Sequence, residues 1–135
     1  MKKYLTKKNV IIVSAVLIVL LTVTISLILF NKKDSYSAKE SVYQTVVVKD
    51  LRFKNASIVK DGSLYTYTVE VENLSKNEYE VNNVSFKFYD SNDKEIANML
   101  GYVGKKMKPN EKVVVTSTVD IDIRNASEVE IVVEK

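Results

Sequence analysis

Residues 64–73 read LYTYTVEVEN, and this stretch decides the fold class. Every second residue from Tyr65 to Val71 is a tyrosine or a valine, whereas the residues between them are threonine or glutamate. Because successive side chains of a strand point to opposite faces, this alternation predicts a strand with one buried and one solvated face. The stretch is therefore predicted to be a half-buried β-strand.

The same period-two pattern, rich in branched and aromatic residues, continues through the rest of the chain. Residues 45–59 form either one long strand or two strands broken near Lys54–Asn55. Asp61-Gly62 and Pro109 mark turns between such runs. Six or seven short strands with frequent turns and no helical period predict an all-β antiparallel sandwich over residues 45–135.

A single long apolar run precedes this region. Residues 10–30 read VIIVSAVLIVLLTVTISLILF, which is 21 residues without a charge, a glycine or a proline. At about 1.5 Å per residue such a helix spans roughly 31 Å, the thickness of the hydrocarbon core of a bilayer. Its hydroxyl groups can bond back to the preceding helical turn. The run is predicted to be an uncleaved transmembrane helix.

Lysine residues flank this run unevenly. Residues 1–9 hold four lysines and no acidic residue, whereas the other flank holds Lys32 and Lys33. Because positive residues favour the cytoplasmic side, the bias predicts a cytoplasmic N-terminus and an extracytoplasmic C-terminal domain. Residues 31–44, which are polar and lack periodicity, are predicted to be a short stalk.

The alternative is a secretory signal that is cleaved. The apolar core of such a signal normally runs about 7–15 residues, which is shorter than the run in this chain. Small-residue cleavage sites are poor and lie near Ser35, Ser37 and Ala38, and the absence of cysteine excludes lipoprotein processing. In this alternative the mature chain is a secreted effector or adhesin.

Charge and residue types limit the partners and the chemistry. Residues 31–135 hold 16 basic and 17 acidic residues, a net charge of −1, so they lack the positive surplus that binds nucleic acid. Without cysteine, neither a disulfide nor a thiolate metal site is possible. Without histidine, acid–base catalysis at neutral pH would need other groups with shifted pKa values. We therefore expect no enzyme activity and no cofactor.

Residues 64–121 resemble, over roughly that range, the FxLYD family of bacterial outer-surface domains. The family pattern is a strand ending in Asn, a polar connection, an F-x-L-Y-D-like strand, a turn and a later Pro-Gly-Glu-like turn. The central motif appears as residues 86–90, FKFYD, in which Phe88 replaces the leucine. The later turn reads Pro109-Asn110-Glu111, with asparagine in the glycine position. The resemblance implies an immunoglobulin-like sandwich at a bacterial envelope and carries over no catalytic residue.

The motif residues also have a physical role in a sandwich. Phe86 and Phe88 would lie on the buried face of a central strand, while Tyr89 would keep its hydroxyl in water. Asp90 can accept backbone N–H bonds in the following turn, and Pro109 supplies a fixed φ angle. These five residues are predicted to be a fold motif and not a catalytic, cofactor or metal site.

Two ligand sites remain as alternatives. Residues 90–95, DSNDKE, could supply oxygen ligands to Ca²⁺, although their spacing departs from the EF-hand loop and a turn rich in Asn and Asp explains them better. The eight tyrosines could include a platform for cell-wall glycans. Tyr65 and Tyr67 are assigned to the core or its rim, and Tyr102 closes a strand in a glycine-containing stretch.

The resulting hypothesis is a non-enzymatic, single-pass membrane protein whose outer sandwich binds or scaffolds other envelope components. Its partners would be the lipid bilayer and another envelope protein or a cell-wall component. The long first strand, or the strand nearest the C-terminus, would offer an edge for strand addition by a partner. A further hypothesis, a hydrolase of wall polymers, would depend on carboxylates alone.

Overall fold

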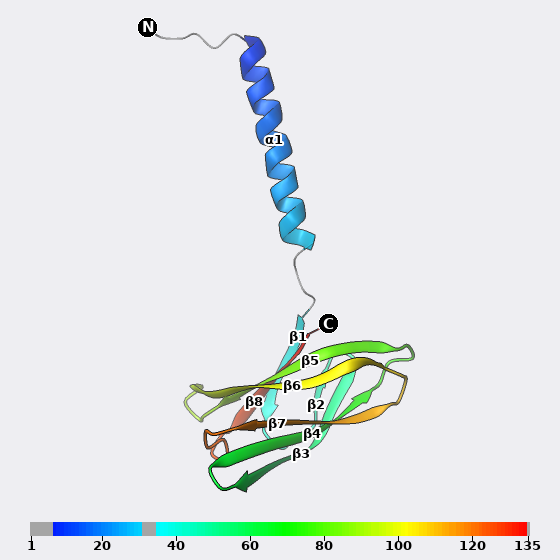
Figure 1. Cartoon of the computed structure of the whole chain (residues 1–135), viewed down its shortest axis with the longest axis vertical. Helices are drawn as coiled ribbons and strands as arrows, with labels where there is room; N and C mark the ends of the chain where they lie inside the picture. The colour runs from blue at the N-terminus through cyan, green and yellow to red at the C-terminus, as the bar shows by residue number, and fades with distance from the viewer. Residues whose placement is uncertain (1–6, 31–34, 135) are drawn as a thin grey trace. The chain divides into compact units, whose positions relative to one another are not determined.

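The computed structural model describes residues 7–30 and 35–134, and within the helix it describes the side chains of residues 11–25. The chain divides into two compact units, Met1–Lys33 and Asp34–Lys135. Figure 1 shows a helix in the first unit and β-structure in the second.

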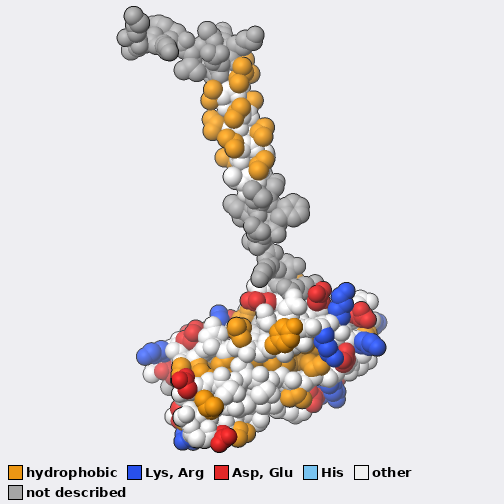
Figure 2. Space-filling model, in the orientation of Figure 1, with side chains coloured by type: hydrophobic (Ala, Val, Ile, Leu, Met, Phe, Trp, Pro, Cys, Tyr) orange, Lys and Arg blue, Asp and Glu red, His pale blue; other side chains and the backbone are white. Residues whose placement is uncertain are grey.

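Helix α1 spans Lys7–Phe30, so the long apolar run is helical. The large apolar side chains described in α1 are exposed within this unit, and Figure 2 shows them over the visible face of the helix. The hydroxyl of Thr22 donates to the carbonyl of Val19 at 2.8 Å, as expected for a hydroxyl within a helix. Among the described residues, no helix is both long enough and apolar enough to span a membrane. Of the predicted cytoplasmic segment, residues 1–9, the first six residues lie outside the described residues.

The described part of the second unit contains eight strands in two antiparallel four-stranded sheets, which Figure 1 shows as two layers. Sheet A has the strand order β1-β8-β5-β6, and sheet B has the order β2-β3-β4-β7. In chain order the strands are β1 (Ser35–Ser41), β2 (Val46–Val48), β3 (Leu51–Asp61), β4 (Leu64–Asn73), β5 (Tyr79–Tyr89), β6 (Glu95–Met107), β7 (Lys112–Val119) and β8 (Glu128–Glu134).

The prediction of six or seven strands over residues 45–135 fits the seven strands β2 to β8, although the first run is divided at a different place. The chain turns at Lys49-Asp50, between β2 and β3, where Lys49 adopts a left-handed φ of 55°. The break predicted near Lys54–Asn55 is instead a bulge inside β3. There the register with β4 shifts, and Asn55 has a φ of 56°.

The eighth strand is β1, which occupies residues predicted to be stalk. The stalk prediction is wrong over Ser35–Ser41, because this segment pairs with β8 along its whole length. Only Tyr36 and Ala38 of β1 pack against the core. A strand with two apolar residues gives no clear alternation, which explains the error. Residues 31–34 of the predicted stalk lie outside the described residues.

The core lies between the two sheets and confirms the predicted buried faces. Tyr67, Val69 and Val71 of β4 and Phe86 and Phe88 of β5 are each at most 1% exposed. The Tyr67 ring meets Phe86 and Phe88 edge-on, with ring centres 5.0 and 5.1 Å apart. Edge-to-face pairs of this kind add about 0.5–1.5 kcal/mol to simple burial. The second unit is therefore a β-sandwich with an aromatic centre.

The antiparallel order gives the sandwich two distinct ends. The near end is where β1 begins and β8 finishes, and it carries the β2–β3, β4–β5 and β6–β7 connections. The far end carries the β1–β2, β3–β4, β5–β6 and β7–β8 connections. Each surface described below is placed by these two ends.

Candidate functional site

The five motif residues divide between the core and two turns. Phe86 and Phe88 are in the core, and Tyr89 follows them at the far end of β5. The hydroxyl of Tyr89, predicted to bond to water, donates to Glu130 Oε2 at 3.0 Å. The Lys39 ammonium lies 4.1 Å from the centre of the Tyr89 ring. Burial, together with the bond to Glu130, raises the pKa of Tyr89.

Asp90 acts in the β5–β6 turn as predicted. Its Oδ1 accepts the backbone N–H of Asn92 at 2.8 Å and that of Lys94 at 3.0 Å. Asp93, in the same turn, adopts a left-handed φ of 62°. Since Asp and Asn tolerate this conformation and bond their own backbone, the acidic sequence here is explained by the turn.

The same turn, for which the sequence analysis kept a Ca²⁺ site as an alternative, carries an ion pair. The Lys39 ammonium pairs with Asp93 and, at 3.0 Å, with Glu128 Oε2. These two hydrogen-bonded carboxylates raise the pKa of Lys39. Among the described residues, no group of three or more carboxylates is arranged to hold a metal ion. The charge of the turn is thus balanced by a lysine from β1.

Asn73, the last residue of β4, is a polar group in the core to which the sequence analysis assigned no role beyond ending a strand. It is 0% exposed. Its Nδ2 donates to the carbonyls of Asn77 at 2.9 Å and of Met107 at 3.0 Å, and its Oδ1 accepts the N–H of Ser75 at 2.9 Å. One side chain therefore ties the β4–β5 connection to the end of β6. The period-two pattern places Asn73 on the buried face, and this was the available signal.

The β6–β7 turn places Pro109 as predicted. The backbone N–H of Glu111 donates to the carbonyl of Lys108 at 3.0 Å, and Asn110 has a φ of 61°. A proline followed by a residue with positive φ defines a type II turn, so Asn110 does take the glycine position. Glu111 Oε2 accepts the N–H of Lys108 at 2.7 Å, and Oε1 pairs with Lys105. The pKa of Glu111 is lowered mainly by its bond to Lys105 and secondly by the backbone N–H of Lys108.

One flank of the sandwich, formed by β6 and β7, is closed by direct contact between the two sheets. The hydroxyl of Ser117 donates to the carbonyl of Leu100 at 2.8 Å. A Cβ atom added at Gly101 would lie 2.3 Å from Cγ1 of Val115 and 2.9 Å from the Phe86 ring. Glycine is thus required here for the close approach of β6 to β7. We call this the closed flank.

The opposite flank is open at the far half of β3. Strand β2 pairs only with Leu51–Phe53. Ser57–Asp61 pair with β4 on one side, and among the described residues no strand pairs with their other side. The prediction that the long first run offers an edge is therefore confirmed for this half of β3, which we call the open edge. The alternative edge at the C-terminal strand is wrong, because β8 lies between β1 and β5.

The outer face of sheet B changes in character along its length. Its near half carries ion pairs, among them Lys54 with Glu72 at 3.2 Å, which lowers the pKa of Glu72. Its far half includes two hydroxyl pairs, Thr66–Thr118 at 3.0 Å and Thr68–Thr116 at 3.4 Å. Val59 of the open edge is 58% exposed beside them. The open edge is thus bordered by threonine hydroxyls and ends in two exposed charged residues, Lys60 and Asp61.

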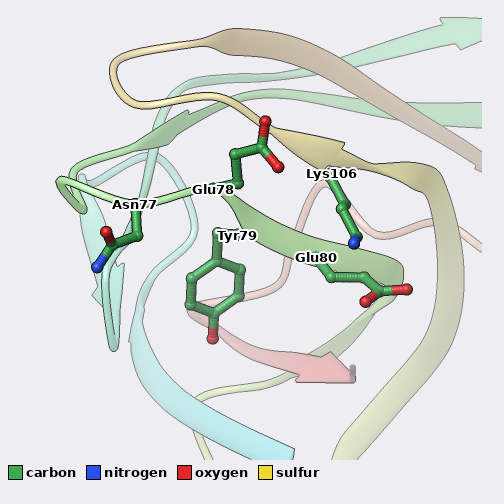
Figure 3. A pocket seen from close by; sticks show the side chains of 5 residues that line it. All are labelled: Asn77, Glu78, Tyr79, Glu80 and Lys106. Atoms are coloured by element: carbon green, nitrogen blue, oxygen red, sulfur yellow. The ribbon is translucent and has the colours of Figure 1, made fainter.

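A hollow of about 530 Å³ lies at the near end and is lined by residues 77–80 and Lys106 (Figure 3). Glu80 and Lys106 are opposite each other in the β5–β6 register, and Figure 3 shows both side chains on the same side of the strands. The Tyr79 ring points the other way and is 6% exposed. The hollow is polar, with charges of both signs, and offers no nucleophile paired with a base.

The tyrosines in the described part of the chain do not form one platform. Tyr65 and Tyr67 are buried, as the sequence indicated. Tyr79 begins β5 and is buried as well. Tyr102 differs because it is 77% exposed on the outer face of β6.

Comparison with known proteins adds no functional assignment. No protein-family model matches the chain, and neither the curated proteins nor the solved structures give a significant match.

Proposed function

We propose that this chain is a non-enzymatic, membrane-anchored envelope protein whose β-sandwich binds another envelope component through the open edge of β3. The observation that carries the proposal is the edge at Ser57–Asp61, beside which no strand pairs among the described residues, and which is bordered by the threonine pairs Thr66–Thr118 and Thr68–Thr116. An exposed edge is a template for strand addition, in which main-chain hydrogen bonds supply affinity and side-chain contacts supply specificity.

The anchor in this proposal is α1. A helix of 24 residues is about 36 Å long, and residues 10–30 within it carry no charge. Four lysines in residues 1–9 favour a cytoplasmic N-terminus. The chain is then single-pass, with the sandwich outside the cell membrane.

The position of β1 argues against a cleaved signal as the alternative. The small residues at which cleavage was considered, Ser35, Ser37 and Ala38, all lie within β1 and pair with β8. Cleavage there would remove part of an edge strand from the sandwich. A secreted effector or adhesin would therefore begin with an incomplete sheet A.

The proposal includes an immunoglobulin-like fold of the FxLYD type. In sheet B, β3, β4 and β7 have the order of the A, B and E strands of an immunoglobulin domain. In sheet A, β5 and β8 have the places of C and F, and β1 takes the place beside F that the last strand normally takes. The FKFYD motif then lies on the C strand at the centre of sheet A.

The residue content favours binding over catalysis. The chain has no histidine and no cysteine, the two side chains that most often carry acid–base or nucleophilic chemistry near neutral pH. The described carboxylates with lowered pKa values, Glu72, Glu111 and Asp122, are each explained by a neighbouring Lys or Arg. A wall hydrolase would need a carboxylate with a raised pKa as its acid.

Protease shaving of intact protoplasts tests the anchor and its orientation. The full chain carries a C-terminal tag and is treated with protease before and after lysis. We expect the membrane-bound tag signal to disappear in intact cells. A tag that is protected until lysis would place the sandwich in the cytoplasm, and a shortened, tagged chain in the medium would favour the secreted alternative.

A photo-reactive residue placed at Val59 in cells tests the open edge. We expect a discrete cross-linked adduct from Val59 and none from the matched position Val114, which is also an exposed valine of sheet B, 66% exposed on β7. The Lys60→Pro variant, which disrupts strand pairing along the edge, should remove the adduct. Equal cross-linking at both valines would show that the edge has no special role.

A further inference from the structure

The outer face of sheet A carries an exposed tyrosine at the end of one of two neighbouring rows that contain a single charged residue, Glu134. One row joins Ser37, Val132, Ser85 and Leu100 across all four strands, from β1 to β6. The neighbouring row joins Ser35, Glu134, Asn83 and Tyr102 in the same strand order. We call these two rows the sheet A face. Since neighbouring strands are about 4.8 Å apart, the face is roughly 14 Å wide.

The outer end of the Tyr102 ring lies beside Gly104. Gly104 has a φ of +63°, and a Cβ atom added to it would lie 2.2 Å from Cζ and from the hydroxyl oxygen of Tyr102. A side chain at residue 104 would therefore displace the ring. Tyr102 is 77% exposed, so most of its ring is open to solvent. An exposed aromatic ring offers an apolar face for stacking.

A hollow of about 390 Å³ adjoins this ring. It is lined by Ser85, Lys87, Asn98, Leu100, Val132 and Glu134. The small side chain of Ser85 forms its floor, and its hydroxyl donates to Asn98 Oδ1 at 2.8 Å. Leu100, at 68% exposed, stands between the hollow and Tyr102. The face thus combines an aromatic ring, an aliphatic side chain, amides, hydroxyls and one carboxylate.

We propose that the sheet A face binds a linear glycan built from N-acetylhexosamines. The C–H side of a pyranose ring is apolar and stacks on an aromatic ring, while its hydroxyl groups need hydrogen-bond partners such as Asn83 and Glu134. The acetamido group matches the amides of Asn83 and Asn98, which offer both donors and acceptors. Glu134 in the two rows and Lys87 in the hollow offset each other in charge, so this surface has no positive surplus for a polyanion.

This site is separate from the open edge. The sheet A face and the open edge belong to different sheets, and Tyr102 is on β6 whereas Val59 is on β3. A chain that gives no adduct through Val59 can still bind a glycan, and the reverse also holds. The glycan site can therefore be tested independently of the strand-addition site.

Titration with chitohexaose, a linear oligomer of N-acetylglucosamine, tests the proposal. The full chain is held in micelles of a phosphocholine detergent, since a detergent with a sugar headgroup would compete, and binding is followed by calorimetry. We expect saturable binding that is about fivefold weaker in Tyr102→Ala, from the loss of one stacking contact. Tyr102→Phe should bind within twofold of the unchanged chain. Tyr43→Ala is the matched control, because Tyr43 is 59% exposed and outside the face.

The Gly104→Ala variant tests the geometry while keeping the aromatic group. The added methyl displaces the Tyr102 ring, so binding should weaken as in Tyr102→Ala. Thermal unfolding of each variant shows that the sandwich is retained. Absence of binding by the unchanged chain to chitohexaose and to purified peptidoglycan overturns the proposal. Equal affinity of Tyr102→Ala and the unchanged chain, or preferential binding of poly(glycerol phosphate), also overturns it.

Discussion

The closed flank and the open edge are opposite sides of one sandwich, and they differ in how far their edge strands are covered. On the closed flank, Gly101 lets β6 approach β7 and Ser117 bonds the carbonyl of Leu100. At the open edge, β2 is too short to cover Ser57–Asp61. Among the described residues, the open edge has no counterpart of the contact between sheets on the closed flank.

The largest effect on this comparison is expected from Asn73→Ala. The Asn73 amide holds the end of β6, and its loss leaves the carbonyls of Met107 and Asn77 without this donor. Removing one partner of a buried hydrogen-bonded group costs about 1–3 kcal/mol, so we expect a decrease of about 3 kcal/mol in the free energy of unfolding for these bonds together. Chemical unfolding followed by circular dichroism measures it.

The matched control for this variant is Asn77→Ala. Asn77 lies in the same connection with an exposed side chain, and the bonds at this residue use its backbone carbonyl and N–H. A change within about 0.5 kcal/mol is expected. Equal destabilisation by both variants would contradict the role assigned to the Asn73 side chain.

The next largest effect is expected from Gly101→Ala on the closed flank. The new methyl would overlap Val115 and the Phe86 ring, and overpacking of this kind costs typically 1–3 kcal/mol. We expect a decrease of about 2 kcal/mol in the free energy of unfolding. Gly62→Ala is the control without a steric conflict, because nothing lies within 4 Å of its added Cβ.

Gly62 still has a φ of +58°, so its substitution carries a backbone cost of about 1 kcal/mol. The comparison therefore separates packing from backbone strain. If Gly62→Ala proves the more destabilising of the two, close approach of β6 to β7 is not what makes glycine necessary at position 101.

A smaller effect is expected from Ser117→Ala. The variant removes the hydrogen bond between the sheets and leaves the carbonyl of Leu100 without its hydroxyl partner. The net contribution of one such bond is about 1 kcal/mol. Thermal unfolding should show a correspondingly small decrease in stability. Ser57→Ala, at the open edge, should leave the stability unchanged within about 0.5 kcal/mol.

The contrast between the flanks shows what the sequence could predict. Alternation in residues 64–73 correctly predicted the buried face of β4, and the FKFYD stretch correctly predicted the two core phenylalanines. Burial of apolar side chains leaves a direct record in the residue types, because each buried face repeats every second position. The predicted turns at Asp90 and Pro109 are confirmed for a similar reason, since turn conformations favour few residue types.

Features that depend on pairing between distant segments could not be predicted in this way. The sequence does not reveal that β1 joins β8 or that β8 is internal, because register and strand order are long-range properties. Gly101 and Gly104 were noted only as neighbours of Tyr102. Their separate roles, one inside the closed flank and one beside an exposed ring, follow from which face of β6 each glycine serves.

The smallest effect on stability is expected from acidification, which tests the contribution of charge at the β6–β7 turn. Lys105 and the backbone N–H of Lys108 lower the pKa of Glu111 below its ordinary value of 4.5. The folded state therefore binds the proton of Glu111 less readily than the unfolded state does. The stabilisation is complete above about pH 4.5 and is lost as the pH falls through the lower folded-state pKa.

Glu111→Gln should make the fall in stability on acidification shallower, as measured by unfolding at a series of pH values below 5. The fall will persist in part, because Glu72 and Asp122 also have lowered pKa values. Glu78→Gln is a suitable control, since the carboxylate of Glu78 lines the near-end hollow and takes no part in the hydrogen bonds described for the turn. An unchanged pH profile in Glu111→Gln would mean that the turn next to the closed flank is held by Pro109 and Asn73, with no contribution from charge.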